Sequence, residues 1–175
     1  MHSLSLLKEL FRHMTWADAK IWDTVLSISD AHKDEKLKII LYHLHVVQYA
    51  FYHIWLDLPL EFPEPSEFKK LQGLASWASK YPELLRSFLT ELTEKDLRRM
   101  ITIPWSNRLE KLIGKKPSET NLAETMLQVT AHSSHHRGQV NNRIRSLNGE
   151  PPLVDFIAWV WIGKPSAVWP VTANE

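Results

Sequence analysis

The segment His132–Gln139, HSSHHRGQ in one-letter code, brings three histidines and an arginine into one short stretch of the chain. Histidine is the commonest metal-binding side chain, and it also serves as a general acid or base. Because His132 and His136 are four residues apart, a helix would place both imidazoles on one face, where they can converge on a metal ion. The zinc helix His-Glu-x-x-His has this spacing, although its glutamate is missing here. The alternative is that these histidines are hydrogen-bonded residues of the core.

Four long helices are predicted to position these residues. Apolar side chains recur in them at helical spacing, and no glycine or proline interrupts the first. Pro82 falls within the third, which is therefore either kinked or begins near Tyr81 with proline in its first turn. The helices are expected from Leu4 to about Ile28, from Asp34 to about Leu58, from Leu74 to about Leu92, and from a cap at Ser118 or Thr120 to about Leu147.

Two further segments have a different pattern. The stretch from Arg98 to Glu119 has short β-branched runs, which indicate irregular structure with a short hairpin between Met100–Ile103 and Leu109–Ile113. The segment after Pro152 is too apolar to be solvated, so it is expected to pack back on the helices, with one short helix of its own.

A helix turns about 100° per residue, which gives each histidine a direction relative to the apolar stripe of its helix. On the last helix His136 lies within the stripe, His132 lies at its edge, and His135 points toward the flank. The stripe consists of Leu122, Met126, Val129, Ser133, Val140, Ile144 and Leu147.

On the second helix the same construction places His43 in the middle of the stripe and His45 on the opposite face. Periodicity therefore selects His43, His132 and His136 as inward-facing. Three histidine ligands leave coordination positions open for water or substrate, which is typical of catalytic metal sites. Imidazole binds Zn, Ni, Fe and Cu alike, so the ligand set does not choose the metal. The stripe of the second helix consists of Ile39, Ile40, Val47, Ala50, Ile54 and Leu58.

Composition limits the class of protein. The 175 residues have a formal net charge of +1, and the lysines and arginines are scattered, which argues against nucleic-acid binding. The chain contains no cysteine, so disulfides, thiolate metal sites and a cysteine nucleophile are excluded. No apolar run has the roughly 18–20 residues that a membrane helix needs. Charges at Lys8, Glu9 and Arg12 do not fit a signal peptide, so a soluble cytoplasmic protein without membrane association is expected.

The sequence HSSHHRGQV resembles the H-x-x-H-H-R-G-Q signature of the DinB/YfiT-like (damage-inducible) family of metalloenzymes. The segments LFRHMTWADAKIWDTVL and LYHLHVVQYAFYHIW are similar to the first two helices of that family, with Trp16, Ala17 and Gln48 at matching positions. The segment LNGEPPLVDFIAWVW resembles the family's exit from the fourth helix and its C-terminal tail. The resemblance covers nearly the whole chain, and the fourth-helix motif is its most specific part.

The resemblance implies an all-α fold, a four-helix bundle of the up-down-down-up type with a long connection between helices 3 and 4 and the tail packed on the bundle. Residues 1–175 would form this single DinB-like domain, and a homodimer is expected. It also implies a divalent metal, Zn, Ni or Fe, bound by His43, His132 and His136, the three histidines that periodicity selects. His135 matches the family's adjacent histidine, which is not normally a ligand.

Neighbouring residues have alternative roles. His135 and Arg137 are the candidate catalytic residues. Arg137 and Gln139 would either hydrogen-bond around the site and contact a substrate carboxylate, or cap the helix and bridge to the tail. Gly138 is expected to permit the close approach of a neighbouring helix.

Aromatic residues outside the motif are expected to pack in the core more often than to bind substrate. In the tail, Asp155, Trp159 and Trp161 either wall the metal pocket or belong to the core. On the first helix, Trp22 is expected to make packing or dimer contacts. Gln48 is predicted to face away from the metal ligands of its helix.

The predicted function is that of a metal-dependent transferase or hydrolase acting on small molecules, with a low-molecular-weight thiol as co-substrate, in detoxification or stress response. A metal with open coordination positions lowers the pKa of a water or thiol ligand. Relatives in this superfamily include thiol-dependent transferases and isomerases, and a chain without cysteine must take any thiol from solution. The alternative is a non-catalytic metal-binding stress protein whose metal holds the second and fourth helices together.

Overall fold

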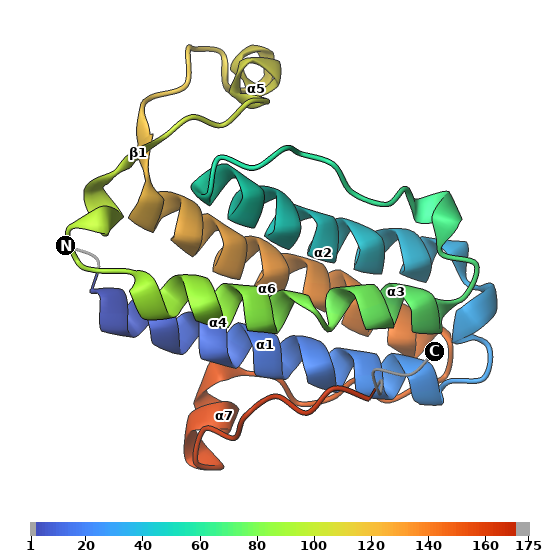
Figure 1. Cartoon of the computed structure of the whole chain (residues 1–175). Helices are drawn as coiled ribbons and strands as arrows, with labels where there is room; N and C mark the ends of the chain where they lie inside the picture. The colour runs from blue at the N-terminus through green and yellow to red at the C-terminus, as the bar shows by residue number, and fades with distance from the viewer. Residues whose placement is uncertain (1–2, 171–175) are drawn as a thin grey trace.

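The computed structural model describes residues 3–170, and it is mostly helical, which confirms the predicted all-α class. Figure 1 shows the long helices lying side by side, with α3 and α4 following one another along the same line. Helix α6 packs most extensively against α2 and α1. The helices of this body are α1 (Leu4–Ser27), α2 (Glu35–Trp55), α3 (Leu71–Ala78), α4 (Tyr81–Glu91) and α6 (Leu122–Ser146).

The predicted third helix is divided in two. Helix α3 ends at Ala78 and α4 begins at Tyr81, with Pro82 in the first turn of α4. Of the two predicted alternatives, the helix that begins near Tyr81 is therefore the observed one. Proline has no amide hydrogen to donate, so it is tolerated in the first turn of a helix but not in its interior.

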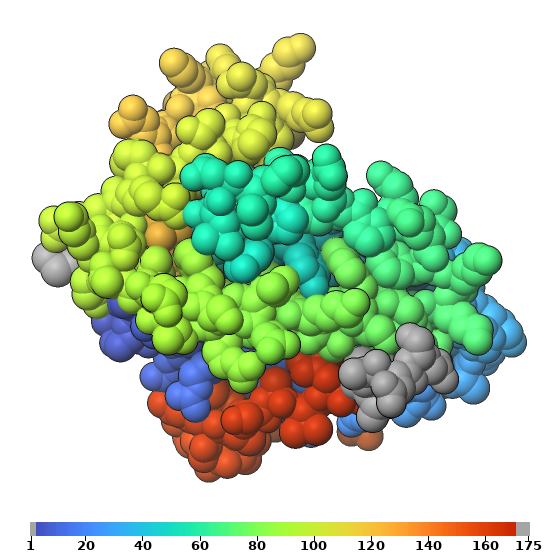
Figure 2. All heavy atoms as spheres, in the orientation of Figure 1, coloured from blue at the N-terminus to red at the C-terminus, as the bar shows by residue number. Residues whose placement is uncertain are grey.

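The predicted hairpin pairs the wrong segments. Strand β1 (Met100–Ile101) pairs antiparallel with β2 (Thr120–Asn121), and the segment expected as the second strand belongs to helix α5 (Ser106–Ile113). Helix α5 has no buried residue, and it projects from the body in Figures 1 and 2. The sequence of α5 is amphipathic, yet its apolar residues Leu109, Leu112 and Ile113 are exposed.

Strand β2 leads directly into α6. Asn121 is the N-cap, one residue beyond the predicted cap at Thr120, and its side chain accepts a hydrogen bond from the amide of Glu124. The carboxylate of Glu124 accepts in turn from the amide of Asn121, which completes a capping box. This cap fixes where α6 begins and therefore the direction of every histidine along it.

The C-terminal segment packs back against α1, as Figure 2 shows. Trp159 is fully buried against Trp16 and Ala17, and its indole nitrogen donates to the carbonyl of Pro165. The remaining short elements are η1 (Ala31–Lys33), η2 (Pro65–Glu67), η3 (Asp96–Arg98) and α7 (Phe156–Trp161). Within residues 3–170, no helix combines the length and the apolar character that crossing a membrane demands.

Candidate metal centre

Three histidines from two helices converge where α2 packs against α6. His43 comes from α2, and His132 and His136 come from α6. The Nε2 atom of His132 lies 3.3 Å from Nε2 of His43 and 3.0 Å from Nε2 of His136. One nitrogen of each ring lies within 4.8 Å of the others, the one such group of His, Asp and Glu side chains found within residues 3–170. The structure thus brings together the three residues that the sequence selects.

These separations fit a single divalent ion. With metal–nitrogen bonds of about 2.0–2.1 Å, neighbouring ligand nitrogens lie about 3.3–3.4 Å apart in tetrahedral coordination and about 2.8–3.0 Å apart in octahedral coordination. The two Nε2–Nε2 distances at His132, 3.0 and 3.3 Å, fall across this interval. The three side chains could therefore hold a metal ion with little rearrangement, and the distances do not choose between metals.

The ring of His132 cannot satisfy its neighbours by hydrogen bonding alone. Its Nε2 faces two other Nε2 atoms, but a neutral imidazole carries one proton and can donate it to one of them at most. Its Nδ1 is buried and has no hydrogen-bond partner in the described part of the chain. A cation between the three Nε2 atoms removes the conflict around Nε2, because each ring could then present a lone pair to it.

The surroundings favour the neutral rings that a metal requires. Desolvation by burial lowers the pKa of His132 to about 4, with further lowering by the nearby His136 and His43. Desolvation also lowers the pKa of His43, and His136 adds to the effect. The Oε1 atom of Gln139 lies 2.8 Å from Nδ1 of His136. Because an amide oxygen only accepts, Nδ1 of His136 carries the proton and its Nε2 lone pair faces the cluster.

A known protein family matches most of this chain. The model of the DinB family matches residues 1–165, which include all three histidines. The chain belongs to the DinB family. No curated protein matches it. The histidine cluster of this DinB-family protein lies in the part of the chain that the family model covers.

The adjacent His135 lies outside the cluster, on the flank of α6 that the sequence predicts. It is exposed, and its ring centroid is 5.0 Å from that of His136. Its Nε2 lies 3.1 Å from Nε2 of Gln139, so Gln139 connects the two histidines. The predicted alternative in which Gln139 hydrogen-bonds around the site therefore describes its position.

Arg137 has a different environment from the one predicted for it. Its guanidinium donates to Asp18 of α1 at 2.8 Å, and the two side chains are 5% and 3% exposed. Arg137 therefore points into the helical body, where it neutralises a buried carboxylate, and its hydrogen bond goes neither to the helix end nor to the tail. A buried charge left without its partner is strongly destabilising, so the pair binds α1 to α6.

A buried chain of hydrogen bonds continues from Asp18 across three helices. Asp18 Oδ2 accepts from Nε2 of Gln48 at 2.7 Å, and the same nitrogen donates to Ser133 Oγ at 3.0 Å. Nδ1 of His45 lies 2.9 Å from Oε1 of Gln48, and the indole nitrogen of Trp22 donates to Nε2 of His45 at 2.8 Å. Since an indole only donates, His45 carries its proton on Nδ1 and gives it to Gln48. The buried polar network thus joins α1, α2 and α6.

The predicted directions on the second helix are wrong for His43 and His45, whereas Gln48 faces away from His43 as predicted. His45 is 1% exposed and lies inside, where burial lowers its pKa, and Gln48 is also buried. His43 is exposed at the edge of α2, and Ile39, predicted in the core stripe, is 57% exposed. Helix α2 carries apolar residues of its own on nearly all of its faces, so its sequence does not define a single apolar stripe. The buried face consists of Leu37, Leu41, Leu44, His45, Gln48, Tyr49, Phe51, Tyr52, Ile54 and Trp55.

The predicted role of Gly138 is also wrong. A Cβ atom at Gly138 would meet no other atom within 4 Å, so no helix approaches it closely. Gly149, just after α6, has that role instead, because a Cβ there would lie 2.5 Å from Cδ1 of Ile28. Gly138 and Arg137 line an open cavity of about 610 Å³ between α6, α1 and the tail.

The tail residues do not wall the histidine cluster. Asp155 lines the 610 Å³ cavity, to which none of the three clustered histidines contributes. Trp159 is core, packed on Trp16, whereas Trp161 is 77% exposed. The core alternative therefore holds for Trp159, and the packing alternative holds for Trp22, which is fully buried.

Proposed function

We propose that this DinB-family protein is a metal-dependent transferase or hydrolase of small molecules that uses a low-molecular-weight thiol as co-substrate, in detoxification or stress response. The observation that carries the proposal is the convergence of three Nε2 atoms at a place that solvent reaches. His43 is exposed, and His132 and His136 are half-buried. A site with three protein ligands and access from outside is typical of catalytic centres.

The residues of the site have different roles in the proposed reaction. His43, His132 and His136 hold a divalent ion, Zn, Ni or Fe, and such an ion lowers the pKa of a water or thiol that it binds. Gln139 fixes the tautomer of His136. His135, exposed beside His136, is placed to accept a proton from an incoming thiol at the rim of the site. The thiol comes from solution, because the chain contains no cysteine.

The proposal also includes the bundle type, the domain organisation and the oligomeric state. The helices of the body form a four-helix bundle of the up-down-down-up type, in which α3 and α4 together make the third member, and residues 1–175 form one domain. Two such chains form a homodimer. Analytical ultracentrifugation of the metal-loaded protein measures its mass and so distinguishes a dimer from a monomer.

A second candidate is a non-catalytic stress protein with a structural metal. It is favoured by the origin of the ligands, since His43 belongs to α2 and the other two belong to α6. A metal there would join the two helices and stabilise the fold. The two candidates differ in whether exogenous ligands enter the coordination sphere, which the absorption spectrum of a cobalt-substituted sample reports when thiol is added.

Replacing the candidate ligands tests the metal site itself. In protein purified without an affinity tag, His43→Ala, His132→Ala and His136→Ala should each abolish stoichiometric metal in elemental analysis, because two imidazoles hold an ion far more weakly than three. His32→Ala, which removes an exposed histidine of η1, is the matched control and should keep its metal. Equal metal content in all four variants would refute the site.

Turnover tests the enzymatic part of the proposal. Metal-loaded protein is incubated with small electrophiles and several low-molecular-weight thiols, and thiol consumption is measured against protein without metal. Metal-dependent turnover with one of the thiols is expected. Metal binding without turnover for any thiol, and without a spectral change on thiol addition, would favour the structural-metal candidate.

A further inference from the structure

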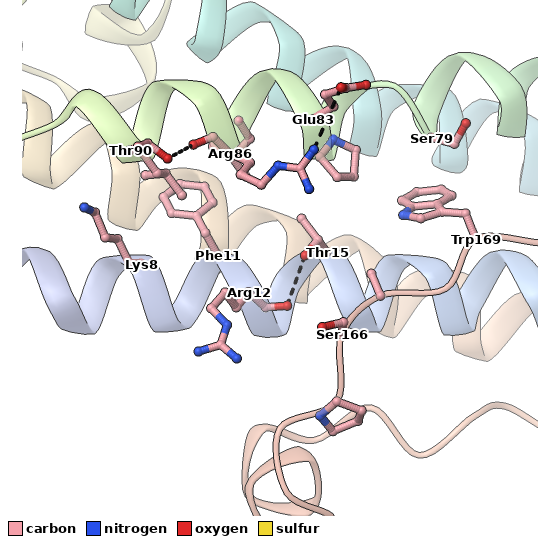
Figure 3. Close-up of a pocket in the computed structure, with 15 residues that line it drawn as sticks. Lys8, Phe11, Arg12, Thr15, Ser79, Glu83, Arg86, Thr90, Ser166 and Trp169 are labelled. Atoms are coloured by element: carbon pink, nitrogen blue, oxygen red, sulfur yellow. Dashed lines mark hydrogen bonds and ion pairs between the residues drawn. The ribbon is translucent and has the colours of Figure 1, made fainter. Parts of the chain in front are cut away.

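A second cavity, of about 530 Å³, lies between α1, α4 and the segment Pro165–Trp169 of the tail. Figure 3 shows it from the side, with Phe11 and Lys8 on α1, Arg86 on α4 and Trp169 at one end. No lining residue belongs to α2 or α6, the helices that carry the histidine cluster. Its volume falls in the range of roughly 300–1,000 Å³ that is usual for small-molecule sites.

The floor of this cavity is apolar. Phe11, Leu85 and Leu89 are 1%, 2% and 9% exposed, and they belong to the hydrophobic core. Pro82 and Ala167 line the cavity beside them. A ligand held here would place an apolar body against these side chains, and burial of that body would supply much of its affinity.

The rim of the cavity is cationic. Lys8, Arg12 and Arg86 line it, against one acidic residue, Glu83. The Glu83–Arg86 pair is exposed and 3.8 Å long, so it neutralises Arg86 only weakly. The ammonium of Lys8 has no ion-pair partner within 4.0 Å in the described part of the chain, and Arg12 turns toward the ring of Trp159 at 5.8 Å. An anionic group is therefore the complement that this rim lacks.

The indole nitrogen of Trp169 supplies a directed donor. It is buried and has no hydrogen-bond partner in the described part of the chain, and in Figure 3 it lies on the side of the ring that faces the cavity. An indole N–H can only donate, and leaving it unmet in a buried position is destabilising. An acceptor oxygen on a ligand would satisfy it.

We propose that this cavity is a binding site for a small organic carboxylate with an apolar, aromatic-sized body. The body lies on Phe11, Leu85 and Leu89, one oxygen accepts from the Trp169 indole, and the carboxylate charge is complemented by Lys8 and Arg86. The site is separate from the histidine cluster, so it does not rest on the proposed catalytic function.

The test uses 2-naphthoate as the probe and 2-naphthalenemethanol as its uncharged counterpart, added to full-length metal-loaded protein labelled with ¹⁵N. The indole N–H signal of Trp169, assigned by its loss in Trp169→Phe, should shift saturably with the acid. The alcohol should bind about tenfold more weakly, because it lacks the charge that the rim complements. This readout is independent of enzymatic activity and of whether the metal site is catalytic.

Three variants locate the binding. Trp169→Phe keeps the ring and removes the donor, so naphthoate affinity, followed on the other indole signals, should fall about five- to tenfold. Lys8→Ala should reduce affinity about two- to fivefold, as expected for a partly exposed charge. Lys36→Ala removes an exposed lysine from α2 and is the matched control, with no change expected.

Several results would overturn the proposal. These are equal affinity for the acid and the alcohol, a shift confined to tryptophans outside the cavity, and equal effects of Lys8→Ala and Lys36→Ala. Movement of the Trp169 signal with protein concentration alone would show that a second copy of the chain occupies the cavity, which also refutes the small-molecule assignment.

Discussion

His132 and His136 face α2 at the edge of the helical body, whereas Ser133 and Arg137, each one residue later, point into its interior. The first pair has half-buried rings whose Nε2 atoms lie 3.0 Å apart. The second pair is buried, with Arg137 on Asp18 and Ser133 accepting from Gln48. A rotation of about 100° along α6 thus separates imidazoles whose Nε2 atoms face one another from side chains that pair with residues of other helices.

The two faces of α6 contribute differently to the protein. The interior face is satisfied by the protein itself, so it supports the fold. On the histidine face the Nε2 atoms of His43, His132 and His136 point toward one another, so a cation from outside could bind them. Substitutions on the two faces should therefore separate stability from metal affinity.

The largest expected effect is on the interior face. Arg137→Ala leaves the buried carboxylate of Asp18 without its cation, and the free energy of unfolding of the metal-free protein should fall by about 3–5 kcal/mol in urea denaturation. Arg145→Ala, an exposed arginine on the same helix, is the matched control and should change it by less than about 0.5 kcal/mol. Similar values for the two variants would show that the faces do not differ in this way.

A smaller effect is expected beside the histidine face. Gln139→Ala removes the acceptor that fixes the tautomer of His136, so metal affinity measured by chelator competition should fall about 10- to 100-fold. The stability of the metal-free protein should hardly change, because Gln139 is exposed. Gln128→Ala, an exposed glutamine earlier on α6, serves as the control. An unaltered affinity in Gln139→Ala would remove the orienting role.

The smallest effect concerns pH. The pKa of His132 is about 4 in the folded protein, below its ordinary 6.5, so the unfolded chain binds the proton more readily. The stability that this difference provides is complete above about pH 6.5 and is lost as the pH falls toward 4. His132→Asn should therefore flatten the pH dependence of metal-free unfolding by about 1–2 kcal/mol between pH 7 and 5. Parallel curves for the two proteins would contradict the lowered pKa.

The long helices were predictable because local signals agree with the tertiary structure. Helix α6 combines a capping box at its start with an apolar stripe along its length, and both depend only on residues near in sequence. The position of Pro82 was likewise readable, since proline constrains its own turn. The pairing of β1 with β2 was not, because it joins strands separated by α5, and the amphipathic pattern of that helix is short.

The candidate site was predicted for reasons that are only partly right. The four-residue spacing of His132 and His136 is sound helical geometry. His43 was selected as an inward residue, yet it is exposed and reaches the cluster from the edge of α2. Periodicity placed His43 in the middle of the stripe of α2, and the family resemblance selected the same residue from its motif. Side-chain direction on a helix that is apolar nearly all round is decided by its neighbours, which the sequence of the helix alone does not contain.

The buried polar network was missed, although one signal for it was present. Asp18 occupies a helical position whose neighbours four residues away, Met14 and Trp22, are both apolar, and a carboxylate in such a stripe needs a buried partner. The partner, Arg137, lies far along the sequence, so its identity depended on how α1 packs against α6. Composition and spacing could have indicated that a partner exists, but not which residue it is.

The hydrogen bonds from Trp22 to Asp18 have one further consequence, for how the sequence can change over evolution. Every proton in the chain Trp22–His45–Gln48–Asp18 is ordered from one end, because the indole can only donate and the carboxylate can only accept. Glutamate at position 48 would place a second carboxylate against Asp18, and a neutral side chain at position 18 would relieve that repulsion. We expect these four positions, carried on two helices, to be inherited as a linked set.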